Sequence, residues 1–159
     1  MAMTMNDLTV NFSHLDRDTL FEAWQWLIGP SKLPILLTAA GDAFVQDAED
    51  ATVHFLDVGA GQLHPIAGSA EELSSLLANK DFVVNHLAVQ MVGAIMQAGR
   101  RLEPGQIYSF KVLPVLGGQY DLNNVEAMDI AVHFSLAGQI HEKVRNLPPG
   151  TPIDGFRIE

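Results

Sequence analysis

The stretch from Leu33 to Ala67 constrains the fold more than any other part of the chain. Short apolar segments follow one another there: ILLT, AFVQD, TVHFLD and QLHPIA are separated by Gly-Asp, by the acidic DAEDA and by VGAG. Short apolar runs bounded by Gly and Asp are typical of β-strands joined by tight turns. This stretch therefore predicts a meander of antiparallel strands.

Apolar residues at helical spacing predict helices before and after the meander. The spacing predicts helices at 19–28, 70–78, 81–99 and 124–147. The second should begin at a capping box, Ser69-Ala-Glu-Glu, and the third should lie centrally because its apolar stripe covers almost its full circumference. IYSFKVLPVL reads as a further strand, and FRIE at the end as an edge strand. Because strands and helices do not alternate strictly, the fold class predicted is α+β, an antiparallel meander packed against several helices.

Size and composition indicate one domain. The chain has 159 residues, of which 48% are hydrophobic, enough for a single core. We expect an N-terminal arm and helix at 1–32, compact with an α+β domain at 33–159. No residue is cysteine, which excludes disulfides and thiolate chemistry. The first residues lack the features of a secretory signal, and polar residues interrupt the longest apolar run, so we expect a cytoplasmic protein without a membrane span.

The charge balance restricts the class of partner. Nine Lys and Arg face nineteen Asp and Glu, so the chain should repel nucleic acid and anionic membranes and prefer a neutral or basic partner. Between Lys32 and Lys80 there is no cation but seven carboxylates. Acidic turns often serve only solubility and protect strand edges. Alternatively, a surface formed by these residues binds the basic cleft of an enzyme that handles nucleic acid. The candidates for such a surface are Asp42, Asp47, Glu49, Asp50 and Asp57.

The paired glycines in VLGGQYDLNN raise the possibility of a phosphate-binding loop. Such loops need a defined glycine pattern and usually a cation, whereas here acidic residues follow and no cation occurs between Lys111 and Lys143. We interpret the glycines as a chain reversal ahead of a helix capped by Asn123-Asn-Val-Glu126. Tyr120, next to Asp121, instead has the chemistry of a protein-binding hot spot.

Catalytic and metal-binding patterns are weak. The six histidines form no ligand motif, and His133 and His141 are expected on different helix faces. If Phe55 pairs with Leu63, His54 and His64 face each other near Asp57, which leaves open the alternative of a metal- or small-molecule-binding domain, or an enzyme, with a pocket near these histidines. No nucleophile motif is present. We therefore expect no catalytic residues, no cofactor and no enzyme activity.

A family resemblance rests on residues 102–150. Its landmarks are Leu102 and Gly105, the Leu116-Gly117-Gly118 turn, Asn123-Asn124, Gly138-Gln139-Ile140-His141, and Leu147-Pro148 with Gly150. This pattern, with the meander before it, resembles over about residues 33–153 the C-terminal domain of immunity proteins for type VI secretion DNase effectors. The resemblance implies a cytoplasmic antidote that binds and blocks a cognate toxic effector, often a nuclease. We expect the candidate acidic residues, together with Tyr120 and Asp121, to contact that effector.

Overall fold

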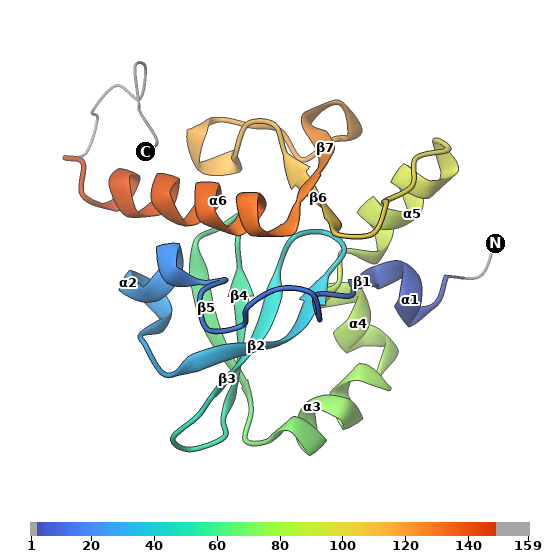
Figure 1. Cartoon of the computed structure of the whole chain (residues 1–159). Coiled ribbons are helices and arrows are strands. Elements are labelled where there is room, and N and C mark those ends of the chain that lie inside the picture. Colours follow the sequence, from blue (N-terminus) through green and yellow to red (C-terminus); the bar gives the residue numbers. More distant parts are fainter. Residues whose placement is uncertain (1–2, 149–159) are drawn as a thin grey trace.

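The computed structural model describes residues 3–148 and has a mixed α+β fold, which confirms the predicted class. Its main sheet is antiparallel, with strands in sequence order (Figure 1). The strands are β1 (Thr9–Val10), β2 (Lys32–Thr38), β3 (Ala43–Asp47), β4 (Val53–Asp57) and β5 (Gln62–Ala67). The meander is thus confirmed, and the expected polar arm adds the short strand β1 at its edge.

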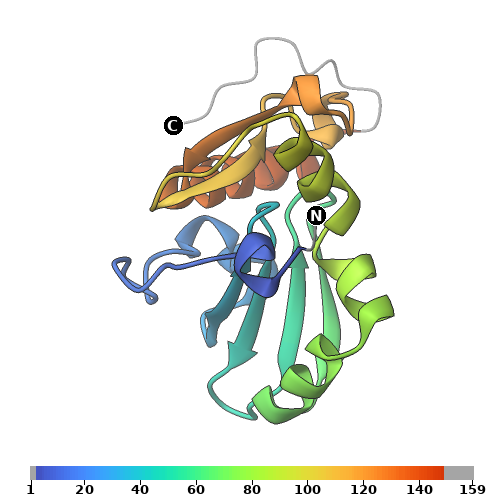
Figure 2. The same cartoon turned by 90° about the vertical axis from the view of Figure 1, so that its right-hand side faces the viewer.

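Helices cover both faces of the sheet (Figure 2). On one face the short helices α3 (Ala70–Leu77), α4 (Lys80–His86) and α5 (Val89–Gln97) follow each other along the chain. The buried residues of α3 and α5, with partly buried side chains of α4, pack with Phe44, Val53 and Phe55. On the other face the 3₁₀-helix η1 (Glu22–Trp24) and α2 (Gln25–Ile28) pack with the alternate strand residues Val45 and Leu56. The alternation of strand side chains therefore builds two cores, one on each side of the sheet.

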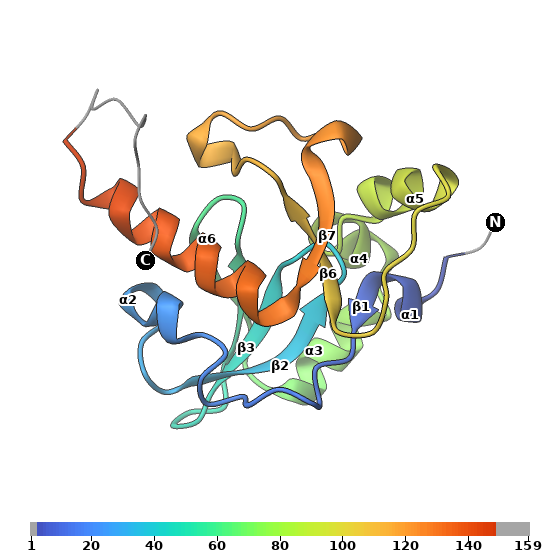
Figure 3. The same cartoon turned by 45° about the horizontal axis from the view of Figure 1, so that its top comes forward.

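The C-terminal helix α6 (Ile130–Arg145) crosses one end of the sheet, where β2–β3 and β4–β5 are joined (Figure 3). His133 Nε2 donates to the carbonyl oxygen of Gly41 at 2.8 Å, and His141 Nε2 donates to that of Val58 at 2.7 Å. The prediction that these histidines lie on different faces was wrong. Eight residues rotate a helix by only about 80°, so both imidazoles reach the same layer of turns.

Residues 125–129 form a strand, not the first turn of a helix. β7 (Val125–Asp129) pairs with β6 (Gln106–Phe110) in a second, two-stranded sheet, and α6 follows it directly. Asp129, not Asn123, is the N-cap of α6, and its side chain accepts the amide of Val132. Apolar residues three apart suited a helix, but pairing with β6 satisfies the backbone of this segment instead.

Two other helices are shorter than predicted. The expected central helix at 81–99 breaks at Ala88, whose φ is +51°, and its first part, α4, buries no residue. Asn79 caps α4 instead of Asp81. The expected helix at 19–28 consists of η1 and α2, and it ends as predicted at Gly29, with φ +79°. The capping box at Ser69 is confirmed in its main part, because Ser69 accepts the amide of Glu72.

The C-terminal predictions lie mostly beyond the described residues. The expected edge strand FRIE falls entirely outside residues 3–148, and of the Pro-Pro-Gly stop only Pro148 falls within them. Within the described part of the chain, no helix has both the length and the apolar character that crossing a bilayer requires.

Gly138 allows α6 to touch η1, and substituting it tests this contact. A methyl group on Gly138 would stand 2.6 Å from the carbonyl oxygen of Ala23, which is backbone and cannot turn away. We expect Gly138→Ala to lower the free energy of unfolding by about 1–3 kcal/mol, despite the higher helix propensity of alanine.

Gly93→Ala on α5 is the matched control, because its methyl would meet only the flexible end of Met3 at 3.0 Å. This variant should be neutral or more stable by up to about 1 kcal/mol. Urea denaturation of both proteins measures the difference. Equal effects of the two substitutions would show that the contact between α6 and η1 is loose.

Candidate functional site

The predicted acidic residues do not form one continuous surface. Asp42 precedes β3 and Asp47 ends it, so about five residues of extended chain, roughly 17 Å, separate them. Asp57 ends the neighbouring strand β4 on the same side as Asp42, whereas Glu49 and Asp50 follow Asp47 in the opposite turn. The structure therefore divides the candidates into an acidic turn (Asp47, Glu49 and Asp50) and an acidic cleft (Asp42, Asp57, Tyr120 and Asp121).

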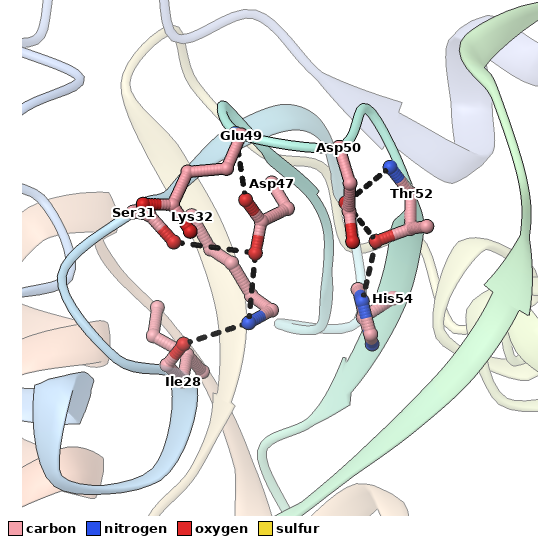
Figure 4. A network of polar contacts seen from close by, with 8 residues as sticks. All are labelled: Ile28, Ser31, Lys32, Asp47, Glu49, Asp50, Thr52 and His54. Atoms are coloured by element: carbon pink, nitrogen blue, oxygen red, sulfur yellow. Dashed lines mark hydrogen bonds and ion pairs between the residues drawn. The ribbon is translucent and has the colours of Figure 1, made fainter.

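In the acidic turn, Asp47 is committed to internal contacts (Figure 4). Its carboxylate pairs with Lys32 Nζ at 3.4 Å and accepts hydrogen bonds from the Ser31 hydroxyl and the Glu49 amide. The Glu49 amide, followed by Lys32 and Ser31, lowers the pKa of Asp47 below its ordinary value. Asp47 thus stabilises the turn and contributes little free negative charge.

Asp50 is also engaged within the acidic turn. Its Oδ1 accepts the Thr52 hydroxyl at 2.6 Å and the Thr52 amide at 3.0 Å, and the Thr52 hydroxyl also contacts His54 Nε2 (Figure 4). The Thr52 hydroxyl, and then its amide, lower the pKa of Asp50. Glu49 is exposed, and only its backbone amide takes part in this network. Two of the three carboxylates therefore maintain the conformation of the turn itself.

The predicted pairing of His54 with His64 was wrong. The β4–β5 hairpin pairs Asp57 with Gln62 beside its turn, and in this register Phe55 lies opposite His64 and His54 lies opposite Pro65. Partners in an antiparallel pair point to the same face, and successive residues point to opposite faces. The two imidazoles consequently lie on opposite faces of the sheet. Across residues 3–148, no three His, Cys, Asp or Glu side chains gather in a way that could hold a metal ion.

The acidic cleft brings together residues that are far apart in the sequence, including Phe110 of β6 and His133 of α6. It has a volume of about 430 Å³ and lies among the turns after β2 and β4, the N-terminal half of α5 and the loop before β7. Four of the seven residues predicted to contact a partner line it: Asp42, Asp57, Tyr120 and Asp121. The apolar part of the wall includes Ala88, Met91, Ala94 and Leu122.

Asp42 lies at the inner side of the cleft. Its Oδ1 accepts the amide of Val58 at 2.9 Å, which joins the two turns, while Asp57 Oδ1 accepts the amide of Ala60 at 3.1 Å. Burial, and then the charge of Asp57, raise the pKa of Asp42 to about 8, although the Val58 amide opposes the shift. At neutral pH, Asp42 is thus a largely protonated carboxyl group, and among residues 3–148 no cation pairs with it.

Tyr120 and Asp121 form the exposed rim of the cleft. The Tyr120 side chain is 69% exposed, and its ring meets Phe110 edge to face at 5.2 Å. Burial, followed by the charges of Asp57 and Asp42, raises the pKa of the Tyr120 hydroxyl, which thus lies near both carboxyl groups. Asp121 Oδ1 accepts the amides of Asn123 and Asn124. Asp121 therefore caps the 3₁₀-helix Leu122–Asn124, and the capping box expected at Asn123 is absent.

The glycine pair acts as a turn, in agreement with the sequence interpretation. Gly117 has φ +94°, and Gly118 lies against the carbonyl group of Val112, where no side chain would fit. Asn124 closes the loop by bonding Val112 at both its amide and its carbonyl, at 2.9 and 2.8 Å. These contacts position the loop that carries Tyr120 at the cleft.

Sequence reasoning missed His133 and the α5 residues of the cleft. His133 Nδ1 accepts the Ser109 hydroxyl at 2.8 Å, and burial lowers the pKa of this histidine to about 4, which keeps it neutral. Met91 was expected in a central helix, and only the break at Ala88 brings it to the cleft wall. No signal in the sequence marks that break.

Comparison with known families supports the resemblance seen in the sequence. Residues 67–141 match the family described as T6SS immunity protein Tdi1, C-terminal. The matched part runs from the end of β5 through most of α6 and includes Tyr120, Asp121 and both buried histidines. The predicted resemblance to this family is thereby confirmed, over a shorter range than the sequence suggested. Asp42, Asp57 and the acidic turn lie before the matched part.

A solved structure has a similar fold. The crystal structure of Atu4351 from Agrobacterium tumefaciens aligns with a TM-score of 0.50 and 18% identity, covering 79% of this chain. The aligned part spans 65% of that protein, so the chain corresponds to only part of its length. No protein of curated function matches the chain.

The raised pKa of Asp42 predicts a pH dependence of stability. The folded-state pKa, about 8, lies above the ordinary value of 3.8, so between these values the folded chain keeps a proton that the unfolded chain loses. Asp42 therefore makes the protein less stable as the pH rises through this window. The free energy of unfolding of Asp42→Asn, relative to that of the wild type, should therefore be higher at about pH 8 than at about pH 5. The increase should be on the order of 2–4 kcal/mol, because one pKa unit corresponds to about 1.4 kcal/mol.

Urea denaturation at the two pH values measures this gain. Glu49→Gln removes the same formal charge at an exposed position and should show no comparable difference. If Asp42→Asn and the wild type differ equally at both pH values, the carboxyl group is not held protonated by burial.

Proposed function

We propose that this chain is an immunity protein that binds and neutralises a cognate toxic effector of type VI secretion, without enzyme activity of its own. The observation that carries this proposal is the match of residues 67–141 to an immunity-protein family. The cytoplasm, where an effector would act on its target, is the location we expect for the complex. The effector is proposed to be basic, and a nuclease is the favoured class.

The charge of the chain supports a basic protein partner. The formal net charge is −10, and the acidic cleft gathers three carboxyl groups around a concave, partly apolar surface. An enzyme that handles nucleic acid carries a basic surface, which such a field attracts while nucleic acid itself is repelled.

The acidic cleft is a better candidate for the centre of the interface than the acidic turn. The cleft combines an exposed aromatic ring, a concave apolar wall and carboxyl groups, which are the features of a binding hot spot. In the acidic turn, Asp47 and Asp50 are occupied by their own neighbours. We therefore propose that the cleft makes the close contacts and that the turn adds long-range attraction. The separation of His54 from His64 removes the support for the alternative site near them.

Co-expression tests the proposed function. The toxin is the product of the reading frame next to the gene for this chain, expressed in bacteria with or without this protein. We expect this protein to restore growth and to elute with the toxin as a stable complex on size exclusion. An unrelated acidic protein of similar size, as the control, should not protect. Growth arrest despite soluble immunity protein, with no complex, would contradict the proposal.

Charge reversal in the acidic turn should change the association rate more than the dissociation rate of the complex. Glu49→Lys reverses an exposed charge whose carboxylate takes part in no described hydrogen bond. At low salt we expect association to slow by a few-fold, on the order of 2–5, with little change in dissociation, because peripheral charges act through steering. Surface plasmon resonance at low and high salt separates the two rates. A large increase in dissociation rate would instead place Glu49 inside the interface.

A further inference from the structure

The composition of the acidic cleft suits a long cationic side chain. Its walls include methyl and thioether groups of Ala88, Met91 and Ala94, whereas the carboxyl groups of Asp42, Asp57 and Asp121 lie around them. A purely polar ligand would leave the apolar wall without apolar contacts. An apolar ligand would remove water from the carboxylates and provide no hydrogen bonds in its place. Side chains that combine an aliphatic stem with a charged head satisfy both parts.

Each carboxyl group of the cleft has one oxygen in use and one unpaired. The Oδ1 atoms of Asp42, Asp57 and Asp121 accept the amides of Val58, Ala60 and Asn123 at 2.9, 3.1 and 3.0 Å, respectively. In the part of the chain that the structure describes, no donor bonds to the three Oδ2 atoms and no cation pairs with these residues. The backbone thus fixes the position of three carboxyl groups and leaves an acceptor of each available to a ligand.

We propose that the acidic cleft receives the side chain of one arginine from the effector. This inference rests on the proposed function, because it takes the partner to be an effector protein. The aliphatic stem would pack on the α5 side of the cleft, and the guanidinium group would bond to the free carboxylate oxygens. The exposed Tyr120 ring, 69% accessible, offers a face for cation–π contact. Arginine fits better than lysine because its planar group has five donors and can serve several carboxylates and a ring together.

The electrostatics of the free protein agree with this assignment. Asp42 holds a proton at neutral pH because burial and Asp57 disfavour its charge, and no cation of the described residues offsets them. A guanidinium group between Asp42 and Asp57 would remove that cause and allow both to ionise. On binding, Asp42 would then lose its proton, and the guanidinium group would offset the charges of the two carboxylates.

A side-chain analogue tests the cleft without the effector. The full chain is titrated with N-acetyl-arginine amide up to about 100 mM, since a single anchor binds in the millimolar range or more weakly. Amide NMR should show saturable shifts at Val58, Ala60 and Asn123, whose N–H groups bond to the three carboxylates. N-acetyl-citrulline amide, which has the same shape but no charge, should not produce them. Equal shifts with citrulline, or none with arginine, would overturn the proposal.

Two variants test whether the analogue binds in the cleft. Asp57→Asn keeps an acceptor for the Ala60 amide, and we expect it to weaken the analogue about tenfold or more, the effect of one hydrogen bond to a charged group. Glu49→Gln changes the net charge equally at the other end of the sheet and should change the affinity less than twofold. Thermal unfolding of each variant confirms that it is folded. Equal weakening by both variants would show a general field and not a site.

Measurements with the effector separate this inference from the proposed function. If the wild type binds the toxin, the double variant Asp57→Asn/Asp121→Asn should bind it about 30-fold or more weakly, the loss typical of a hot spot. Unchanged binding would overturn the arginine site and leave the immunity function standing. If the wild type does not bind the toxin at all, the proposed function fails, and with it the assignment of an effector arginine, whatever the analogue does.

Discussion

Hydrogen bonds from two neutral imidazoles hold α6 against the turns of the sheet, and the geometry of the cleft depends on these bonds. His133 and His141 are buried, and each donates a hydrogen bond to a backbone carbonyl in a different turn. Each turn has a glycine with positive φ, Gly41 or Gly61, where an added methyl group would stand 2.6 or 2.5 Å from the ring. A buried imidazole is tolerable only when it is neutral and bonded, and burial lowers the pKa of both histidines.

The same hydrogen bonds set the positions of the acidic residues. Gly41 immediately precedes Asp42, and Val58 immediately follows Asp57, so the carbonyls that the histidines hold belong to the neighbours of both carboxyl groups. The Val58 amide then bonds to Asp42, which joins the two turns directly. A network of this kind fixes the carboxyl groups before any partner arrives. Preorganisation reduces the cost of ordering these groups on binding.

Much of the fold could be predicted from local patterns, whereas the site depended on long-range contacts. The strands at 43–47 and 62–67 are bounded by turn residues, and their predicted limits match those observed. The segment 125–129 has spacing compatible with a helix, and only its pairing with β6 makes it a strand. Similarly, the pairing of Asp57 with Gln62 beside the turn sets the register that separates His54 from His64, and no local signal marks that register. Asp42, Asp57 and Tyr120 were predicted as contacts of one partner together with the acidic turn, but their place in a separate cleft depends on how the turns after β2 and β4 meet the loop before β7.

The family match covers only some of the residues that form the site. The matched residues 67–141 supply the two imidazoles, Tyr120 and Asp121, while the unmatched meander supplies Asp42 and Asp57. The imidazoles bond to backbone carbonyls, so these bonds do not require a particular side chain in the turns. The exceptions are the glycines, which leave room for the rings. Side chains beside those carbonyls can therefore differ without loss of the two imidazole hydrogen bonds, although Asp42 also joins the turns through the Val58 amide. Such an arrangement lets one frame present different charges, because a change of binding specificity needs only different side chains in the turns.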